Sequence, residues 1–238
     1  FIGYGEGMPE GLRRMRSTLR DIVAARPDAV TMHKGMLAAA WAPYAGVVPA
    51  ILQSSLVRPD DSAFEQGATP EEAIRLGADA IAVVGYVRGE SEAANLRVVA
   101  ECVRQAAPYD LPVICHIYPR DAHDLSISFR PEDIAWAARC AAECGVDVIK
   151  VPYCGDVRAY AEIVADAPAP VVAAGGPRAQ TLEAALQMMA EVVASGARGA
   201  TIGRNVWGFP KITANVCAFK AVIHDGLQPQ EAMRQAGL

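Results

Sequence analysis

Short apolar runs rich in Val and Ile alternate along the chain with Ala-rich stretches of helical periodicity, and this alternation restricts the fold more than any other feature. Several of the runs are apolar almost throughout, as expected for strands buried on both faces. Alternating strands and helices predict a parallel sheet with helices packed outside it. The strand candidates are residues 29–33, 46–52, 80–86, 112–118, 146–151, 170–175 and 199–203.

Two architectures fit this pattern, an open doubly wound sheet and a closed (β/α)8 barrel. No GxGxxG follows the first strand, which disfavours the dinucleotide-binding version of the open sheet. Polar residues gather where the strands end, and barrels carry their active sites at that end. We therefore predict an α/β fold of the (β/α)8 TIM barrel type, with residues 1–238 forming a single domain. The strand-end residues are His33, Lys34, His116, Tyr118, Lys150, Gly175, Gly176, Gly203 and Arg204.

The number of strand candidates is seven, whereas this type of barrel has eight strands. The sequence begins with a Gly-rich loop and a helical stretch, so we expect the first strand to be missing from it and to precede Phe1. A seven-stranded variant is the alternative. Residues 51–74 are the one long loop candidate.

Composition argues against several classes of protein. The 238 residues are 52% hydrophobic, enough for the core of one large α/β domain. No apolar run approaches the ~18 residues of a membrane span, and scattered basic residues with a net charge of −5 argue against nucleic-acid binding. The six cysteines form no CxxC pair, so we interpret them as buried thiols of a cytoplasmic protein. Cys140 and Cys144 lie four residues apart and make at most half of a metal site, so we expect no metal.

Lys150 is the first candidate for chemistry, because it ends an apolar, β-branched strand. If the face that carries Lys150 lines the barrel, its amine is partly desolvated, which disfavours the ammonium form. A neutral amine can attack a carbonyl and form an iminium, an electron sink for making or breaking a C–C bond. The alternative is a surface lysine at a strand end.

Tyr118 ends the preceding strand, so it should lie beside Lys150 at the same edge of the sheet. Aldol chemistry needs a group that moves a proton at the substrate hydroxyl, and a phenol can do this. His116 lies on the same strand face, one layer deeper, where it would orient Tyr118, contact substrate or simply pack in the core. Arg120, just beyond, holds an anionic substrate or closes a loop ion pair.

Glycines follow the last two strands, in AAGGPR (173–178) and TIGRN (201–205). The loops after strands seven and eight of barrels often bind phosphate through backbone N–H groups. Gly175, Gly176 and Gly203 allow close approach of the backbone, and Arg204 and Arg178 add positive charge. Ordinary turn glycines are the alternative.

Five motifs lie at these strand ends: MHKG (32–35), YPR (118–120), DVIKVPYCGD (147–156), AGGPR (174–178) and GRNVWGFP (203–210). Together they resemble the DeoC/FbaB-type class I aldolases, in particular archaeal-type fructose-bisphosphate aldolases and their synthase offshoots. The resemblance covers residues 8 to 225. It implies a barrel enzyme with Lys150 as the Schiff-base lysine, Tyr118 as the general acid/base, and a substrate phosphate held by Gly175, Gly176, Gly203 and Arg204. It also implies a homo-oligomer that needs no metal or other cofactor.

The sequence departs from this family at several positions. The aspartate that ends the family's first strand is absent, since that motif would precede Phe1. His116 stands where a bulky aromatic is common, Arg178 where a lysine is common, and Cys154 where a threonine is frequent; we interpret Cys154 as a packing residue.

The leading hypothesis is a class I aldolase that acts on a phosphorylated ketose such as dihydroxyacetone phosphate or fructose 1,6-bisphosphate. A synthase that joins a sugar-phosphate fragment to aspartate semialdehyde, in an aminohydroxybenzoate or dehydroquinate-type pathway, is an alternative that His116 favours slightly. A thiolase-like relative is a third possibility. A barrel that binds a sugar phosphate without covalent catalysis is the alternative from another class.

Overall fold

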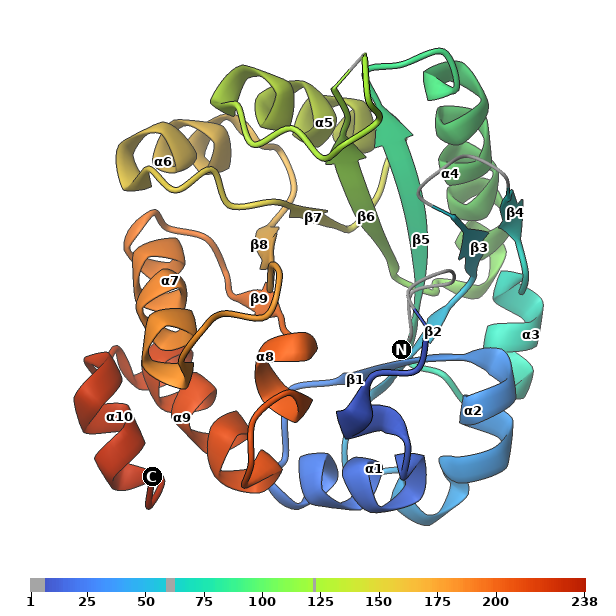
Figure 1. Cartoon of the computed structure of the whole chain (residues 1–238). Coiled ribbons are helices and arrows are strands. Elements are labelled where there is room, and N and C mark those ends of the chain that lie inside the picture. The colour runs from blue at the N-terminus through green and yellow to red at the C-terminus, as the bar shows by residue number, and fades with distance from the viewer. Residues whose placement is uncertain (1–6, 59–62, 122) are drawn as a thin grey trace.

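The computed structural model describes residues 7–58, 63–121 and 123–238, and its centre is a seven-stranded parallel sheet. The strands follow one another around the sheet in the order β1-β2-β5-β6-β7-β8-β9. The sheet curls into an incomplete ring with helices outside it (Figure 1), so the predicted barrel-type α/β architecture is confirmed, with seven strands in the described residues. The strands are β1 (Val30–His33), β2 (Ala50–Gln53), β5 (Ala80–Val87), β6 (Val113–Pro119), β7 (Val148–Val151), β8 (Val171–Ala174) and β9 (Ala200–Thr201).

The helices begin and end near residues that the sequence marks as helix boundaries, such as proline and acidic residues at the start and glycine after the end. Helix α5 starts with Pro131 at its first position and has Glu132 and Asp133 in its first turn, where acidic groups favour the helix dipole. Gly145 and Gly196 follow α5 and α7 with positive φ angles of 82° and 88°. The helices are α1 (Met15–Ala24), α2 (Lys34–Ala40), α3 (Pro70–Arg75), α4 (Glu92–Ala106), α5 (Pro131–Glu143), α6 (Val157–Asp166), α7 (Leu182–Ala194), α8 (Arg204–Trp207), α9 (Ile212–Asp225) and α10 (Pro229–Gln235).

The prediction of one long loop at residues 51–74 is wrong. This segment contains the end of β2, an antiparallel pair made by β3 (Ser55–Val57) and β4 (Phe64–Gln66), and the start of α3. Thr69 and Glu72 close a capping box at the start of that helix. Strands of three residues are too short to show a clear alternation in sequence.

The main core lies between the sheet and the surrounding helices. Outward-facing side chains such as Ile81, Val83, Ile149 and Val151 are fully buried there. No helix in the described part of the chain has the length and apolar character needed to cross a membrane.

The cysteines only partly match the expectation of buried thiols. Cys102, Cys115 and Cys140 are buried, whereas Cys217 is exposed. Cys154 is half-buried and its thiol contacts the carbonyl of Asp156, 3.4 Å away, which agrees with a packing role.

Candidate active site

The inner face of the curled sheet carries the polar residues, because side chains alternate along each strand and neighbouring strands are in register. His116 on β6 pairs with Lys150 on β7, and Tyr118 on β6 pairs with Tyr86 on β5. On the other side of β5, Gln53 of β2 pairs with Ala82, which shares the face of Tyr86. Three predicted residues, Lys150, Tyr118 and His116, therefore lie together on this face.

Lys150 is the only buried lysine among the four in the chain, with 7% of its surface exposed. Its Nζ lies 3.4 Å from Nδ1 of His116. In the described part of the chain, no salt bridge joins this amine to a carboxylate. The predicted placement of Lys150 on the barrel interior is thus what the structure shows, and its neighbour is an imidazole.

His116 is 1% exposed. Burial and the positive charge of Lys150 hold the pKa of His116 well below its usual range, so its imidazole is neutral. A second group, the amide Nε2 of Gln53, lies 3.5 Å from the same Nδ1 atom. The structure therefore places His116 between Lys150 and Gln53, whereas the sequence left open an orienting contact with Tyr118, a contact with substrate or packing in the core.

Tyr118 stands one layer closer to the mouth than His116 and is half-buried. The centre of its ring lies 5.7 Å from Nζ of Lys150 and 6.0 Å from the ring centre of Tyr86. On Tyr86 in turn lies the guanidinium of Arg120, 3.6 Å from the ring centre. Arg120 is 2% exposed, so its charge is buried against an aromatic face. The ring of Tyr118 therefore has the Tyr86 ring and the Lys150 amine as neighbours on the inner face.

The predicted glycines lie where β8 and β9 end, and Asn205 ties their two loops together. Asn205 is 1% exposed, and its Nδ2 donates to the carbonyls of Gly175 and Pro177, at 2.8 and 3.0 Å. Its Oδ1 accepts from the N–H of Ala179 at 2.8 Å. A Cβ on Gly175 would lie 2.9 Å from backbone atoms of residues 201 and 202, so only glycine fits this close approach.

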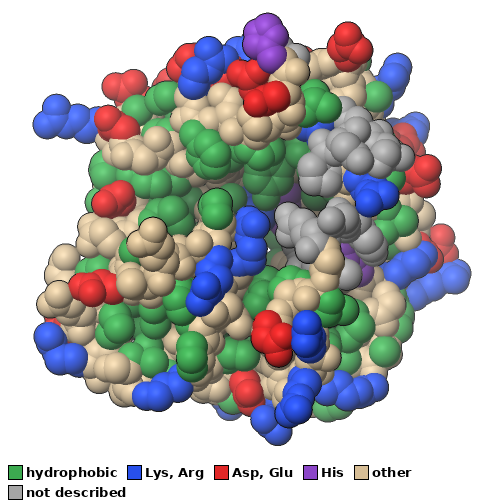
Figure 2. All heavy atoms as spheres, in the orientation of Figure 1, with side chains coloured by type: hydrophobic (Ala, Val, Ile, Leu, Met, Phe, Trp, Pro, Cys, Tyr) green, Lys and Arg blue, Asp and Glu red, His purple; other side chains and the backbone are tan. Residues whose placement is uncertain are grey.

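The two predicted arginines of these loops are exposed. Arg178 donates through Nε to the carbonyl of Gly208 at 3.0 Å and stacks on the ring of Phe209, 4.6 Å from its centre. Arg204 opens helix α8 directly after Gly203. Figure 2 shows Lys and Arg side chains beside the hollow at the centre of the ring.

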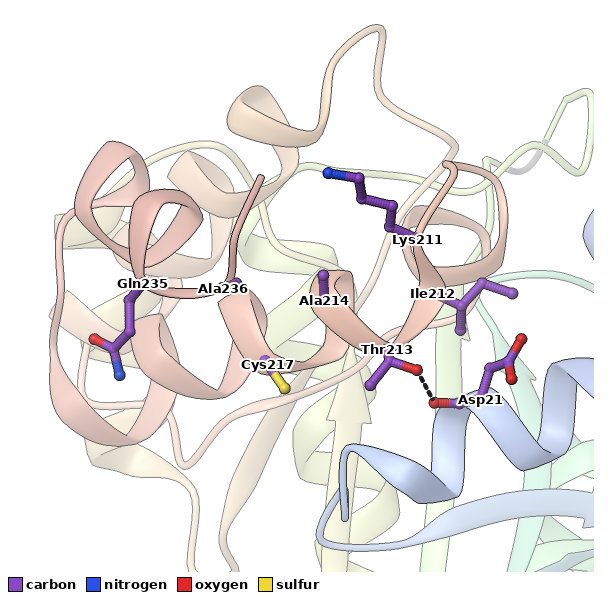
Figure 3. Close-up of a pocket in the computed structure, with 8 residues that line it drawn as sticks. All are labelled: Asp21, Lys211, Ile212, Thr213, Ala214, Cys217, Gln235 and Ala236. Carbon is purple, nitrogen blue, oxygen red and sulfur yellow. Dashed lines mark hydrogen bonds between the residues drawn. The ribbon is translucent and has the colours of Figure 1, made fainter.

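A surface pocket of about 560 Å³ lies elsewhere, between α1, α9 and α10 (Figure 3). Thr213 bridges its wall by donating to the carbonyl of Asp21 at 2.7 Å. The lining residues come from the outer helices and their flanking turns, so this pocket is separate from the inner face. Among the described residues, no cluster of His, Cys, Asp and Glu has the geometry of a metal site.

The chain belongs to the DeoC/LacD family of aldolases. The family model matches residues 4–208, which include all the residues predicted for the site. The resemblance to class I aldolases that the sequence indicated is thereby confirmed.

Individual relatives agree with this assignment. A 2-amino-3,7-dideoxy-D-threo-hept-6-ulosonate synthase of Halobacterium salinarum is 30% identical over 99% of this chain and 89% of its own. A 2-amino-4,5-dihydroxy-6-oxo-7-(phosphonooxy)heptanoate synthase of Streptomyces griseus is 28% identical over 94% of this chain and 82% of its own.

Solved structures extend the comparison to the fold. An archaeal fructose 1,6-bisphosphate aldolase superposes with a TM-score of 0.82 at 30% identity, covering 90% of this chain and 84% of that one. A second archaeal fructose-1,6-bisphosphate aldolase has a TM-score of 0.80 at 28% identity, covering 92% of this chain and 91% of that one. It was solved with its catalytic Lys covalently bound to the carbinolamine intermediate of its substrate.

Three residues of this region were missed at the sequence level: Gln53, Tyr86 and Asn205. Gln53 is the last residue of β2 and Tyr86 the last but one of β5, and both strands are otherwise apolar, so this position is a signal that could have identified them. Asn205 acts through the three hydrogen bonds that it makes to another loop, and a single sequence carries no sign of such contacts.

Proposed function

We propose that this aldolase works by a class I mechanism, with Lys150 forming a Schiff base with a phosphorylated ketose. The observation that carries the proposal is the burial of one lysine on the inner face, beside a neutral imidazole. A desolvated amine with no carboxylate partner in the described part of the chain is suited to act as a nucleophile. The covalent lysine adduct of the archaeal fructose-1,6-bisphosphate aldolase supports the same chemistry.

In this mechanism the Lys150 amine adds to the ketone carbonyl of the donor and gives a carbinolamine. Loss of water then leaves an iminium, which withdraws electrons from the adjacent carbon. In the cleavage direction, Tyr118 removes the proton of the substrate hydroxyl as the C–C bond breaks, and the bonding electrons pass into an enamine. In the synthetic direction, the enamine attacks an aldehyde and Tyr118 returns the proton.

We assign His116 to the contact that holds the Lys150 amine, and the β8 and β9 loops to the phosphate of the substrate. Backbone N–H groups at Gly175, Gly176 and Gly203 would face the phosphate, and Arg178 and Arg204 would add charge at the rim. The mechanism needs no metal or other cofactor, because the iminium itself stabilises the developing carbanion.

For the donor we propose dihydroxyacetone phosphate, either as such or as half of fructose 1,6-bisphosphate. A second candidate reaction is the joining of this donor to aspartate semialdehyde. The heptanoate named for the Streptomyces griseus synthase is the aldol adduct of these two compounds, as breaking the bond between its two hydroxyl-bearing carbons shows. His116, where a bulky aromatic was expected for a fructose-bisphosphate aldolase, favours the second reaction.

We also infer that residues 1–238 work as one domain, because all seven parallel strands share one sheet. A cytoplasmic homo-oligomer remains our expectation for the assembled enzyme, and sedimentation velocity of the purified chain would test the oligomer.

Borohydride reduction in the presence of dihydroxyacetone phosphate tests the proposed function. An iminium is reduced to a stable secondary amine, and peptide mapping should place that adduct on Lys150 and on none of the other lysines, Lys34, Lys211 and Lys220. The Lys150→Met variant is the matched control and should give no adduct. If the wild-type protein binds the donor without an adduct, the chain binds sugar phosphates non-covalently and the class I proposal is wrong.

Enzyme that has not been treated with borohydride can then identify the acceptor. Incubation of enzyme and donor with either glyceraldehyde 3-phosphate or aspartate semialdehyde, without borohydride, should consume one aldehyde and form the corresponding aldol product. Mass spectrometry of the two mixtures distinguishes the fructose-bisphosphate reaction from the synthase reaction.

A further inference from the structure

Gln53 has a fixed orientation because its amide oxygen already has a partner. The backbone N–H of Ser55 donates to Oε1 of Gln53 at 3.0 Å. A backbone N–H can only donate, so the oxygen of this amide must be the atom that faces Ser55. The end that faces His116 is therefore the NH₂ group, with Nε2 at 3.5 Å from Nδ1.

The backbone that carries this amide is held in place by a further pair of hydrogen bonds. Ser55 accepts through Oγ from the N–H of Val84 at 2.8 Å, and Ser54 donates through Oγ to the carbonyl of Ala82 at 2.9 Å. These contacts join the residues between the end of β2 and the start of β3 to β5. Gln53 itself is 1% exposed, so water does not compete strongly for its amide.

Nδ1 of His116 thus faces the NH₂ group of Gln53, which can only donate, and the amine of Lys150, which has hydrogens to donate. A proton on Nδ1 would point at the NH₂ group of Gln53, which has no lone pair to accept it. The imidazole must consequently carry its proton on Nε2 and present the bare lone pair of Nδ1. The low pKa of His116 agrees with a neutral ring.

We propose that Gln53 is a positioning residue of the aldolase: it selects the Nε2–H form of His116, and His116 in that form holds the Lys150 amine by accepting one of its hydrogens. One N–H of the amine is then directed down toward His116, away from the mouth. The nitrogen lone pair is left to face the side from which Tyr118 and a carbonyl substrate approach. This role rests on the proposed Schiff-base function, whereas the protonation pattern of His116 does not.

Which nitrogen of the His116 ring carries the proton can be measured without substrate. The chain has four histidines, so long-range ¹H–¹⁵N correlation spectra of protein labelled at histidine contain signals from only four rings. The signal of His116 is assigned by its loss in a His116→Gln variant. We expect a protonated Nε2 and an unprotonated Nδ1 in the wild-type protein. A protonated Nδ1 would overturn the proposal.

Variants of Gln53 test the link to Lys150. Gln53→Met removes the donor at nearly constant length, and Gln53→Glu keeps an acceptor for Ser55 but turns an acceptor toward Nδ1. The Glu variant should move the proton of His116 to Nδ1, and the Met variant should give a mixture of the two forms. In both variants, the rate of borohydride trapping of the donor on Lys150 should fall about three- to tenfold. This factor corresponds to the loss of one hydrogen bond of ordinary net strength.

Ser54→Ala is the matched control, since it removes a buried hydrogen bond from the same strand end without touching His116. It should leave both the His116 spectrum and the trapping rate unchanged. Trapping at the wild-type rate in a folded Gln53→Met protein would overturn the positioning role. If wild-type protein gives no Lys150 adduct at all, the proposed function and this role fail together, while the spectrum still decides the protonation of His116.

Discussion

Replacement of Lys150 by Met should abolish turnover while leaving the fold at least as stable as before. Methionine nearly fills the space of the lysine stem but has no amine, so no carbinolamine or iminium can form. Removal of the nucleophile from an enzyme that uses covalent catalysis lowers kcat by several orders of magnitude, so we expect a loss of about a thousandfold or more.

The stability part of this prediction follows from the surroundings of the amine. Lys150 is 7% exposed, and its Nζ contacts a neutral imidazole at 3.4 Å. Desolvation of a charged group is costly, and no salt bridge within the described residues offsets it at this position. Met removes that cost, so the free energy of unfolding should be unchanged or should rise by about 1 kcal/mol.

Lys220 provides a control, because its replacement should lower stability without affecting turnover. Its Nζ donates to the carbonyls of Ala25 and Arg26, at 3.3 and 2.6 Å, just beyond the end of helix α1. Lys220→Met should therefore lower the free energy of unfolding by about 1–2 kcal/mol and leave turnover unchanged. Urea unfolding and steady-state kinetics measure both properties in both variants. A Lys150→Met protein that retains turnover, or that loses more than about 2 kcal/mol of stability, would refute the reasoning and make Lys150 a structural residue.

Three further predictions use other parts of the structure. Tyr118→Phe should still give the borohydride adduct but should slow C–C bond cleavage about a hundredfold or more; equal losses in both steps would make Tyr118 a binding residue. Asn205→Ala removes three hydrogen bonds between the β8 and β9 loops, so urea unfolding should show a loss of about 2–4 kcal/mol, with weaker binding of dihydroxyacetone phosphate. Burial raises the pKa of the Cys102 thiol to about 12 and that of Cys140 to about 11. The unfolded chain ionises these thiols first, near pH of about 8.5, so the free energy of unfolding should fall as the pH rises from there toward about 11; urea midpoints against pH should show a shallower fall in Cys102→Ala.

The fold and the central residues could be predicted because they depend on local patterns. Alternation of side chains along β6 puts His116 and Tyr118 on one face, and the βα order puts β7 beside β6 with Lys150 at the same height. The strand candidates match the observed strands closely, with boundaries that differ by up to four residues, as at residues 46–52 against Ala50–Gln53. Terminal residues of elements depend on tertiary hydrogen bonds, which a single sequence does not display.

The contacts that could not be predicted all join segments far apart in the sequence. Gln53 and His116 are separated by 63 residues, and Asn205 reaches back 30 residues to Gly175. A glutamine at the end of an apolar strand gives no indication of which distant ring it will meet. Only the register of β2, β5 and β6 brings the Gln53 amide to Nδ1 of His116.

The contact between Gln53 and His116 explains why a histidine can lie beside the nucleophilic amine of Lys150. A carboxylate within hydrogen-bond distance of an amine stabilises the ammonium ion, which has no lone pair with which to attack a carbonyl. A neutral imidazole accepts a hydrogen from the amine without this strong bias toward the charged form. It can do so only if the nitrogen that faces the amine lacks a proton, and the Gln53 amide imposes that condition on Nδ1. The pair Gln53 and His116 therefore gives Lys150 a fixed direction without giving it a counter-charge, which is the environment that an amine nucleophile requires.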